Sequence, residues 1–221
     1  MAGSSVPAFY GRWAALYDHL ATLPGVSRWR RAAADALDLS PGDTVVEMGC
    51  GTGANLPYLR RRVGPGGRVV GVDLTAELLA RAGDRAPEAG LLRGDATRPP
   101  VAAADAVLGT FVTGMFADPA SVVAEWCGLC SGRVALMDLS ATDDPLGRPL
   151  NPAFRAFTAA STPSSTPGEV LAAVRPGARA SSALSARVRQ GREALVELTV
   201  DRRFERFALG FCGLLSGRTV P

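Results

Sequence analysis

Apolar residues in the middle of the chain follow two alternating patterns. Short, nearly continuous apolar runs begin at five places: near Thr44, Arg68, Gly90, Asp105 and Gly132. Between these runs, apolar residues recur three or four positions apart, which is the spacing of a helix with one buried face. Buried strands that alternate with helices through short connections indicate a parallel sheet covered by helices on both faces. We therefore expect an α/β fold with a doubly wound, Rossmann-like sheet.

The flanking segments predict additions to this core. Before Thr44 there are two helical patterns, separated by Pro24 and Gly25, and after Ser140 a proline-rich stretch precedes a further helix. The C-terminal residues predict two strands that turn near Leu209–Gly210, which brings the sheet to seven strands with the last one antiparallel. The expected division of the chain is an N-terminal helical cap (1–39), a cofactor-binding core (40–140), a candidate substrate lid (141–183), and a closing helix and hairpin of the same domain (184–221).

Composition narrows the class of protein. With 47% apolar and 20% charged side chains, the 221 residues suffice for a single globular domain with a substantial core. The formal net charge is only +3 and the basic residues are scattered, so we expect no nucleic-acid partner. No apolar run reaches the roughly 18 residues of a membrane span, and the N-terminal residues lack the order of a signal peptide. The expected location is the cytoplasm.

The rarer residue types exclude several kinds of chemistry. All 24 basic residues are arginine, which excludes a lysine Schiff base and a phosphate-binding loop with its lysine. There is one histidine, His19, and we expect no metal site. Cys127 and Cys130 are spaced for redox or zinc chemistry, but no second close pair exists, so burial on one face of a helix is favoured. The small number of cysteines and the absence of an evident pairing pattern are typical of a protein in a reducing compartment.

One stretch combines an expected strand end with an expected helix start: "VVEMGCGTGANLPYL", Val45 to Leu59. Gly49, Gly51 and Gly53 stand at alternate positions between the two elements. Glycine weakens the interior of a strand or helix, so three glycines here indicate a backbone that bends sharply or closely approaches a ligand. In a doubly wound sheet, ligands bind beyond the carboxyl ends of the strands, at such a turn. A tight turn without a ligand is the alternative.

Two acidic residues are expected at the same edge of the sheet. Asp73 ends the second strand, where a carboxylate can accept hydrogen bonds from both hydroxyls of a ribose. Asp95 ends the third strand and is placed to accept a hydrogen bond from an adenine amino group. Each such bond to a charged group contributes on the order of 1.5–3 kcal/mol. Together with the glycines, these acids predict an adenosine-containing ligand, although Asp73 alone would also suit a helix N-cap.

The glycine spacing distinguishes among adenosine ligands. The dinucleotide fingerprint is G-x-G-x-x-G, whereas here the third glycine comes one residue early. With Glu47 included, "VEMGCGTG" resembles the first motif of the class I S-adenosylmethionine-dependent methyltransferases, and "GVDLT", "GDAT" and "SGRVALMD" resemble later motifs of that family. The resemblance covers about Arg12 to Ser140. Two outer segments, "FYGRWAALYD" and "PLGRPLNPAFRAF", are most similar to quinone-biosynthesis C-methyltransferases and phosphatidylethanolamine N-methyltransferases.

The resemblance implies S-adenosylmethionine as the cofactor and a role for each matching position. The turn from Glu47 to Gly53 would cup the methionine part, with Glu47 orienting its amino group through water or the backbone of the turn. The other implied contacts are Asp73 with the ribose, Leu74 beside the adenine, Asp95 and Ala96 at the adenine edge, and Thr110 and Phe111 along the pocket. The family pattern is incomplete, because Ser131 precedes a single glycine where two are usual. The helix that usually precedes Asp105 is also expected to be missing.

Two residues of the expected N-terminal cap complete the candidate site. By the resemblance, Tyr17 would cover the cofactor. His19 is a candidate catalytic base that takes a proton from an acceptor hydroxyl, although a helix-surface or packing role is more common. The expected partner is a small-molecule acceptor, and the apolar residues of the candidate lid favour an apolar or aromatic one. Contact with a membrane surface is expected only for a lipid acceptor, and the oligomeric state is left open.

The expected reaction is methyl transfer, because the methyl group is the least hindered carbon on the sulfonium. Two alternatives remain open, since a fold of this kind determines only the cofactor. The same pocket could transfer or cyclise the aminocarboxypropyl arm, or it could bind the cofactor without catalysis. An NAD-dependent oxidoreductase is disfavoured by the glycine spacing and by the absence of lysine.

Overall fold

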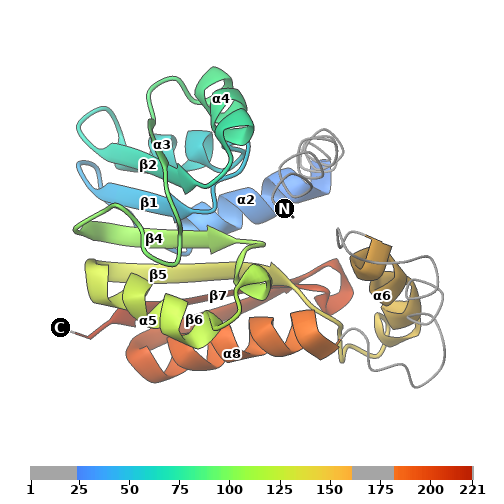
Figure 1. Cartoon of the computed structure of the whole chain (residues 1–221). Helices are drawn as coiled ribbons and strands as arrows, with labels where there is room; N and C mark the ends of the chain where they lie inside the picture. Colours follow the sequence, from blue (N-terminus) through green and yellow to red (C-terminus); the bar gives the residue numbers. More distant parts are fainter. Residues whose placement is uncertain (1–23, 161–181, 221) are drawn as a thin grey trace, which may run out of the picture.

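The computed structural model describes residues 24–160 and 182–220 (Figure 1). The helices and 3-10 turns are α2 (Pro24–Asp35), α3 (Leu56–Val63), α4 (Ala76–Arg85), η1 (Thr113–Met115), α5 (Pro119–Leu129), η2 (Arg148–Leu150), α6 (Asn151–Ala160), α8 (Ser182–Leu198) and η3 (Ala208–Gly210). The strands are β1 (Thr44–Met48), β2 (Arg68–Asp73), β3 (Gly90–Arg93), β4 (Ala104–Thr110), β5 (Cys130–Leu139), β6 (Thr199–Phe207) and β7 (Cys212–Thr219). The first expected helical pattern, with Tyr17 and His19, lies outside the described residues.

The seven strands form one sheet in the order β3-β2-β1-β4-β5-β7-β6. β1 pairs in parallel with β2 and β4, while β7 runs antiparallel to both of its neighbours, β5 and β6. The direction of winding reverses between β1 and β4, and this reversal point is where doubly wound sheets bind ligands. The expected α/β fold with an antiparallel last strand is confirmed.

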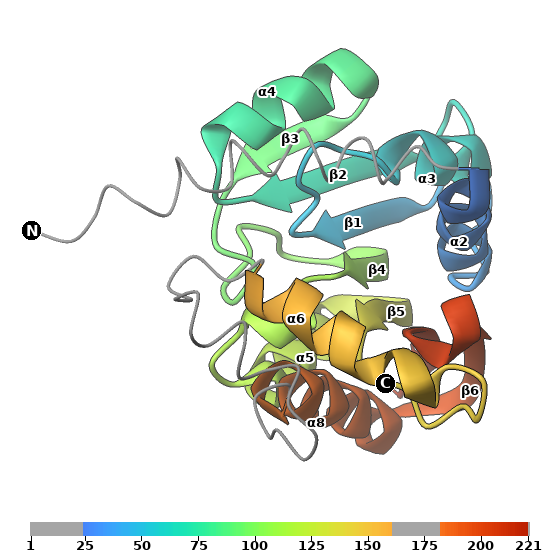
Figure 2. The same ribbon diagram turned by 90° about the vertical axis from the view of Figure 1, so that its right-hand side faces the viewer.

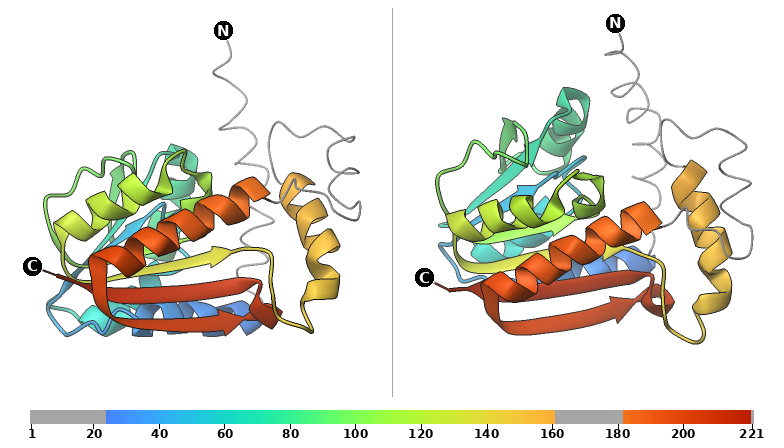
Figure 3. Two further views of the ribbon diagram at one scale, coloured as in Figure 1. Left: turned by 90° about the horizontal axis from the view of Figure 1, so that it is seen from below. Right: turned by 60° about the horizontal axis from the view of Figure 1, so that its bottom comes forward.

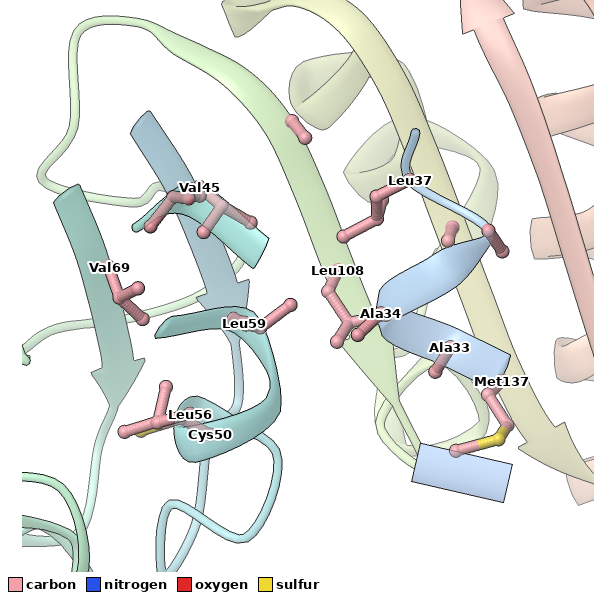
Figure 4. Close-up of a cluster of buried hydrophobic side chains, with 14 of the residues drawn as sticks. Ala33, Ala34, Leu37, Val45, Cys50, Leu56, Leu59, Val69, Leu108 and Met137 are labelled. Atoms are coloured by element: carbon pink, nitrogen blue, oxygen red, sulfur yellow. The ribbon is translucent and has the colours of Figure 1, made fainter. Parts of the chain in front are cut away.

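Side chains that alternate along each strand send apolar residues to both faces of the sheet. Val45 of β1 lies in one cluster with side chains of α2, α3 and α4, and Figure 4 shows its α2 and α3 residues. Val46 and Met48 belong to a second cluster, with side chains of α5 and α8. Figure 3 shows α5 and α8 side by side across that second face. Because side chains alternate with a period of two, Glu47 shares the face of Val45 and points toward the α2 and α3 layer.

A tryptophan joins the second helical layer to the loop after β3. Trp126 of α5 is fully buried, and Gly109 of β4 makes room for it, because a Cβ at Gly109 would lie 2.6 Å from the indole ring. The ring of Phe116 meets Trp126 edge-on, with ring centroids 5.8 Å apart. The indole Nε1 donates to the carbonyl oxygen of Ala96 at 2.7 Å, which fixes the position of the backbone next to Asp95.

Several local expectations can be compared with these elements. The C-terminal hairpin turns at η3, as expected, and no helix lies between Thr97 and Asp105, also as expected. The prediction that one helix carries both Cys127 and Cys130 is wrong, because α5 ends at Leu129 and Cys130 pairs with Ala104 as the first residue of β5. All four cysteines are free. Within the described ranges, no helix has the length and apolar character needed to cross a bilayer.

Candidate cofactor site

The glycine turn lies at the carboxyl end of β1, and its three glycines differ in the space that surrounds a side chain at each position. All three adopt left-handed backbone conformations, with φ of +67° at Gly49, +54° at Gly51 and +72° at Gly53. A Cβ at Gly49 would lie 2.8 Å from Cγ2 of Val112, and one at Gly53 would lie 2.9 Å from the Cβ of Ala82. A Cβ at Gly51 would meet no atom of the described residues within 4 Å. Packing therefore explains the outer two glycines, whereas Gly51 faces open space that a ligand can enter.

Asp73 supports the glycine turn from the end of β2. Its Oδ2 accepts a hydrogen bond from the backbone N–H of Gly51 at 2.9 Å, and its Oδ1 accepts one from the N–H of Thr75 at 2.9 Å. One oxygen of Asp73 thus supports the start of α4 and the other supports the glycine turn, while its contact with a ribose stays a prediction. Each carboxylate oxygen has a second lone pair, so the side chain can still accept bonds from ribose hydroxyls.

The predicted adenine residues lie along the neighbouring loops. Leu74 is 61% exposed, which leaves its side chain free to cover one face of a flat ring. Asp95 is exposed, and its Oδ1 accepts from the N–H of Thr97 at 2.8 Å. Ala96 is buried and is held by Trp126 through its carbonyl. The register of the parallel strands brings the ends of β2 and β3 together, since Asp73 pairs with Arg93.

Glu47 is the centre of a buried polar network. Asn55, at the start of α3, donates through Nδ2 to Oε1 of Glu47 at 2.5 Å and to Oγ1 of Thr110 at 2.9 Å. Arg30 of α2 donates through Nη1 to Oδ1 of Asn55 at 2.8 Å. Oε2 of Glu47 is buried and has no hydrogen-bond partner among residues 24–160 and 182–220. Within this network, one carboxylate oxygen therefore keeps its capacity to accept a hydrogen bond.

Burial raises the pKa of Glu47 from 4.5 to about 7. The hydrogen bond from Asn55 and the positive charge of Arg30 lower this pKa and so counteract part of the effect of burial. A carboxyl that titrates near neutral pH is sensitive to a nearby cation, and perturbed carboxyls of this kind concentrate at functional sites. A cation placed beside this carboxyl would lower its pKa again.

The turn after β4 (Phe111–Met115, hereafter the β4 turn) closes the site on the side of β5. Thr110, at the end of β4, is buried and donates to Oε1 of Glu47 at 3.2 Å. Phe111 follows with φ of +58°, an unusual conformation for a large side chain, and its N–H donates to the carbonyl of Met137 at 2.7 Å. Strained residues of this kind recur at ligand sites, which supports Thr110 and Phe111 as pocket residues.

A separate hollow of about 410 Å³ lies at the opposite end of the sheet. Its lining includes Asp38, Asp105, Ser131 and Arg133, which stand at or near the amino ends of strands and not at their carboxyl ends. Ligands of doubly wound sheets bind at the carboxyl ends. The hollow is therefore not the cofactor site.

Arg30 and Asn55 are the site residues that the sequence did not reveal. Asn55 stands at a helix N-cap, a common place for asparagine, but it makes no capping hydrogen bond because its side chain turns to Glu47. Arg30 is one of three arginines in "RWRR", and no local pattern distinguishes it from its exposed neighbours. The burial of Arg30 depends on how α2 packs against α3, which is a tertiary property.

Comparison with known proteins gives the family. A family model described as a methyltransferase domain matches residues 46–135. The phosphatidylethanolamine N-methyltransferase of Cereibacter sphaeroides is 34% identical over 149 residues, which cover 63% of this chain and 70% of that protein. The chain belongs to the class I S-adenosylmethionine-dependent methyltransferases. Its resemblance to that family at the glycine turn is thereby confirmed.

The chain is also similar to one further relative over part of its length and to a solved structure in its fold. The 2-phytyl-1,4-naphtoquinone methyltransferase of Thermosynechococcus vestitus is 39% identical over 105 residues, or 45% of this chain and 47% of that protein. Human N-acetylserotonin methyltransferase, solved with S-adenosylmethionine, shares the fold with a TM-score of 0.63 at 17% identity, covering 100% of this chain and 60% of that chain. The chain spans about half, or less, of the length of several curated relatives that it matches.

The site of this methyltransferase fits S-adenosylmethionine, the cofactor of the family. Gly51 leaves room for a ligand beside the backbone, and Asp73 offers acceptors one strand away. The unpartnered Oε2 of Glu47 suits the positively charged end of the cofactor. Tyr17 and His19, the remaining predicted site residues, lie outside the described residues.

Proposed function

We propose that this methyltransferase transfers a methyl group to a small, apolar or aromatic acceptor. The observation that carries the proposal is the place of α6, which Figure 1 shows beyond the carboxyl ends of the parallel strands, at the end of the sheet where the glycine turn lies. Figure 2, which looks onto this end, shows α6 on the side of β5 and away from β2 and α4. An acceptor between α6 and the cofactor turn would approach from the side opposite the adenosine.

The cofactor supplies a methyl group that is already activated on a sulfonium, so the protein has to position the reactants and exclude water. In our proposal Asp73 accepts hydrogen bonds from the ribose hydroxyls and Leu74 covers one face of the adenine. Asp95 and Ala96 contact the edge of the adenine. The carboxylate of Glu47 attracts the amino group, while Thr110 and Phe111 line the pocket toward the acceptor. Each role uses a side chain or backbone group at the same edge of the sheet.

The apolar side of α6 supports the class of acceptor. Phe154 and Phe157 of α6 are three positions apart and so share one face, and Leu150 ends the turn η2 directly before the helix. Phe154 packs on Phe211 with ring centroids 5.0 Å apart, whereas Leu150 and Phe157 remain 49% and 41% exposed. Leu146 before the helix is 75% exposed. The relatives named for 2-phytyl-1,4-naphtoquinone and phosphatidylethanolamine lend support to an acceptor with apolar parts.

Two further roles belong to the same proposal. We propose residues 141–183 as a substrate lid, and His19 as the base if the acceptor must lose a proton. The cytoplasm is the proposed location, a choice that the four free cysteines support because thiols persist in a reducing compartment.

Binding and product analysis test the proposal. Calorimetric titration should show binding of S-adenosylmethionine and S-adenosylhomocysteine, and none of NAD. Small-molecule extracts incubated with protein and methyl-labelled cofactor should yield a labelled, apolar product, and chromatography of the spent cofactor should show S-adenosylhomocysteine. Methylthioadenosine formed in step with turnover would instead indicate use of the aminocarboxypropyl arm and would overturn the methyl-transfer proposal.

A further inference from the structure

Asp138, near the end of β5, is a buried carboxyl with no role in the contacts proposed above. It is 1% exposed, and its Oδ2 accepts a hydrogen bond from Oγ1 of Thr113 at 2.5 Å. The backbone N–H groups of Val112 and Thr113 lie near the carboxylate and help to lower its pKa. One side chain from β5 therefore binds the hydroxyl of Thr113 and attracts two N–H groups of the β4 turn, which begins where β4 ends at Thr110.

The β4 turn is in direct contact with the glycine turn. Val112 fills the space beside Gly49 so closely that a Cβ on Gly49 would lie 2.8 Å from Cγ2 and 3.2 Å from Cβ of Val112. Val112 is buried, and there is no gap that would let the two turns shift independently. A displacement of the β4 turn is therefore expected to move the backbone that cups the cofactor.

Helix α8 holds the same turn from the other side. Gly114 lies under α8, because a Cβ there would overlap Cδ1 of Leu184. Arg192 of α8 donates through Nη2 to the carbonyl oxygens of Asp138 at 3.2 Å and of Gly213 at 2.9 Å. Helix α8 thereby contacts the β4 turn through Leu184 and binds β5 and β7 through Arg192.

We propose that Asp138 is a positioning residue for S-adenosylmethionine: by binding the hydroxyl of Thr113 in the β4 turn, it seats Val112 against Gly49 and so sets the affinity of the glycine turn for the cofactor. The inference rests on cofactor binding at that turn. Asp138 does not touch the cofactor in this proposal, because the β4 turn, which includes Thr113, lies between Asp138 and the glycine turn.

The charge of Asp138 gives the proposal a second observable. Burial raises the pKa of Asp138 to about 6, while Thr113 and the charge of Arg192 lower it. Among the described residues, the groups that face it are Arg192 of α8 and Cys212 of β7, and Arg206 of β6 in turn faces Arg192. Burial raises the pKa of Cys212 to about 12, so this thiol stays neutral. Protonation below about pH 6 would weaken the hold on the β4 turn and lower cofactor affinity.

The test measures cofactor affinity in variants of the whole chain. Asp138→Asn should weaken S-adenosylmethionine binding about tenfold in calorimetry, because a neutral amide attracts the N–H groups of the β4 turn less and offers one acceptor oxygen in place of two. Thr113→Val, which removes the hydroxyl and keeps the shape, should weaken binding about fivefold, and Thr113→Ser should restore it to within about twofold. At saturating cofactor, the kcat of each variant should stay near that of the unaltered protein while the KM for cofactor rises.

Asp38→Asn is the matched control, because Asp38 pairs with Arg133 and Arg203 at the opposite end of the sheet. This variant should lose stability and keep its cofactor affinity. If Thr113→Val binds like the unaltered protein, or if Thr113→Ser fails to restore binding, the positioning role is overturned even if Asp138→Asn does not fold. An affinity that is constant from pH 5 to pH 8 also overturns it. Absence of binding by the unaltered protein would overturn the proposed function as well.

Discussion

Replacing Glu47 by glutamine should make the protein more stable and its cofactor binding weaker. Glutamine has nearly the same shape as glutamate, and its carbonyl oxygen can still accept the bond that Asn55 donates to Oε1 at 2.5 Å. What it removes is a carboxylate that is fully buried and whose Oε2 has no partner. The variant thus isolates the effect of the charge from that of packing.

The pKa of Glu47 sets the size of the effect. A rise from 4.5 to about 7 on folding corresponds to about 3 kcal/mol against the ionised form, at about 1.4 kcal/mol for each factor of ten in the acid constant. Between these pH values the folded protein binds more protons than the unfolded chain, so this carboxyl lowers the free energy of unfolding as the pH rises from 4.5 to 7. Glu47→Gln should remove that decline and add up to about 3 kcal/mol at pH 8, with little gain at pH 4.5.

Urea unfolding at pH 5 and pH 8 measures this difference, and calorimetry at pH 8 measures cofactor binding. The variant should bind S-adenosylmethionine at least tenfold more weakly, because the amino group loses its counter-charge. Glu197→Gln, at an exposed position on α8, is the control and should change neither quantity. A variant that is less stable than the unaltered protein at pH 8, or that binds the cofactor equally well, would refute the reasoning.

Four further substitutions test other parts of the site. In Gly51→Ala the new methyl group meets no described neighbour, so the protein should fold, and its positive φ should lower the free energy of unfolding by about 1 kcal/mol. Calorimetry should nevertheless show much weaker cofactor binding. Gly49→Ala should instead unfold at a far lower urea concentration, because its methyl group overlaps Val112. Trp126→Phe loses the bond to Ala96, so the free energy of unfolding should fall by about 2 kcal/mol and the KM for cofactor should rise. Phe157→Ser should raise the KM for the acceptor several-fold and leave cofactor affinity unchanged, and equal acceptor kinetics would remove α6 from the site.

The sequence by itself determined the order of the elements and the edge of the sheet that carries the cofactor. Buried strands such as β4 are nearly continuous in apolar residues, and helices bury one face, so both patterns are visible within a few residues. The turn between β1 and α3 is also local, because its glycines have positive φ whatever packs on them. Asp73 stands at the end of a strand, and the carboxyl ends of parallel strands share one edge of the sheet, so its place beside the turn also follows from local pattern.

Only the tertiary structure decided which polar groups meet and which glycine faces the ligand. Arg30 and Asn55 are 25 positions apart, and Thr113 and Asp138 are also 25 apart, so each pair depends on how whole elements pack. The three glycines look alike in the sequence, yet Val112 and Ala82 occupy the space beside two of them and leave only Gly51 open. Periodicity records whether a side chain is buried, whereas the identity of its partner depends on the packing of residues distant in the chain.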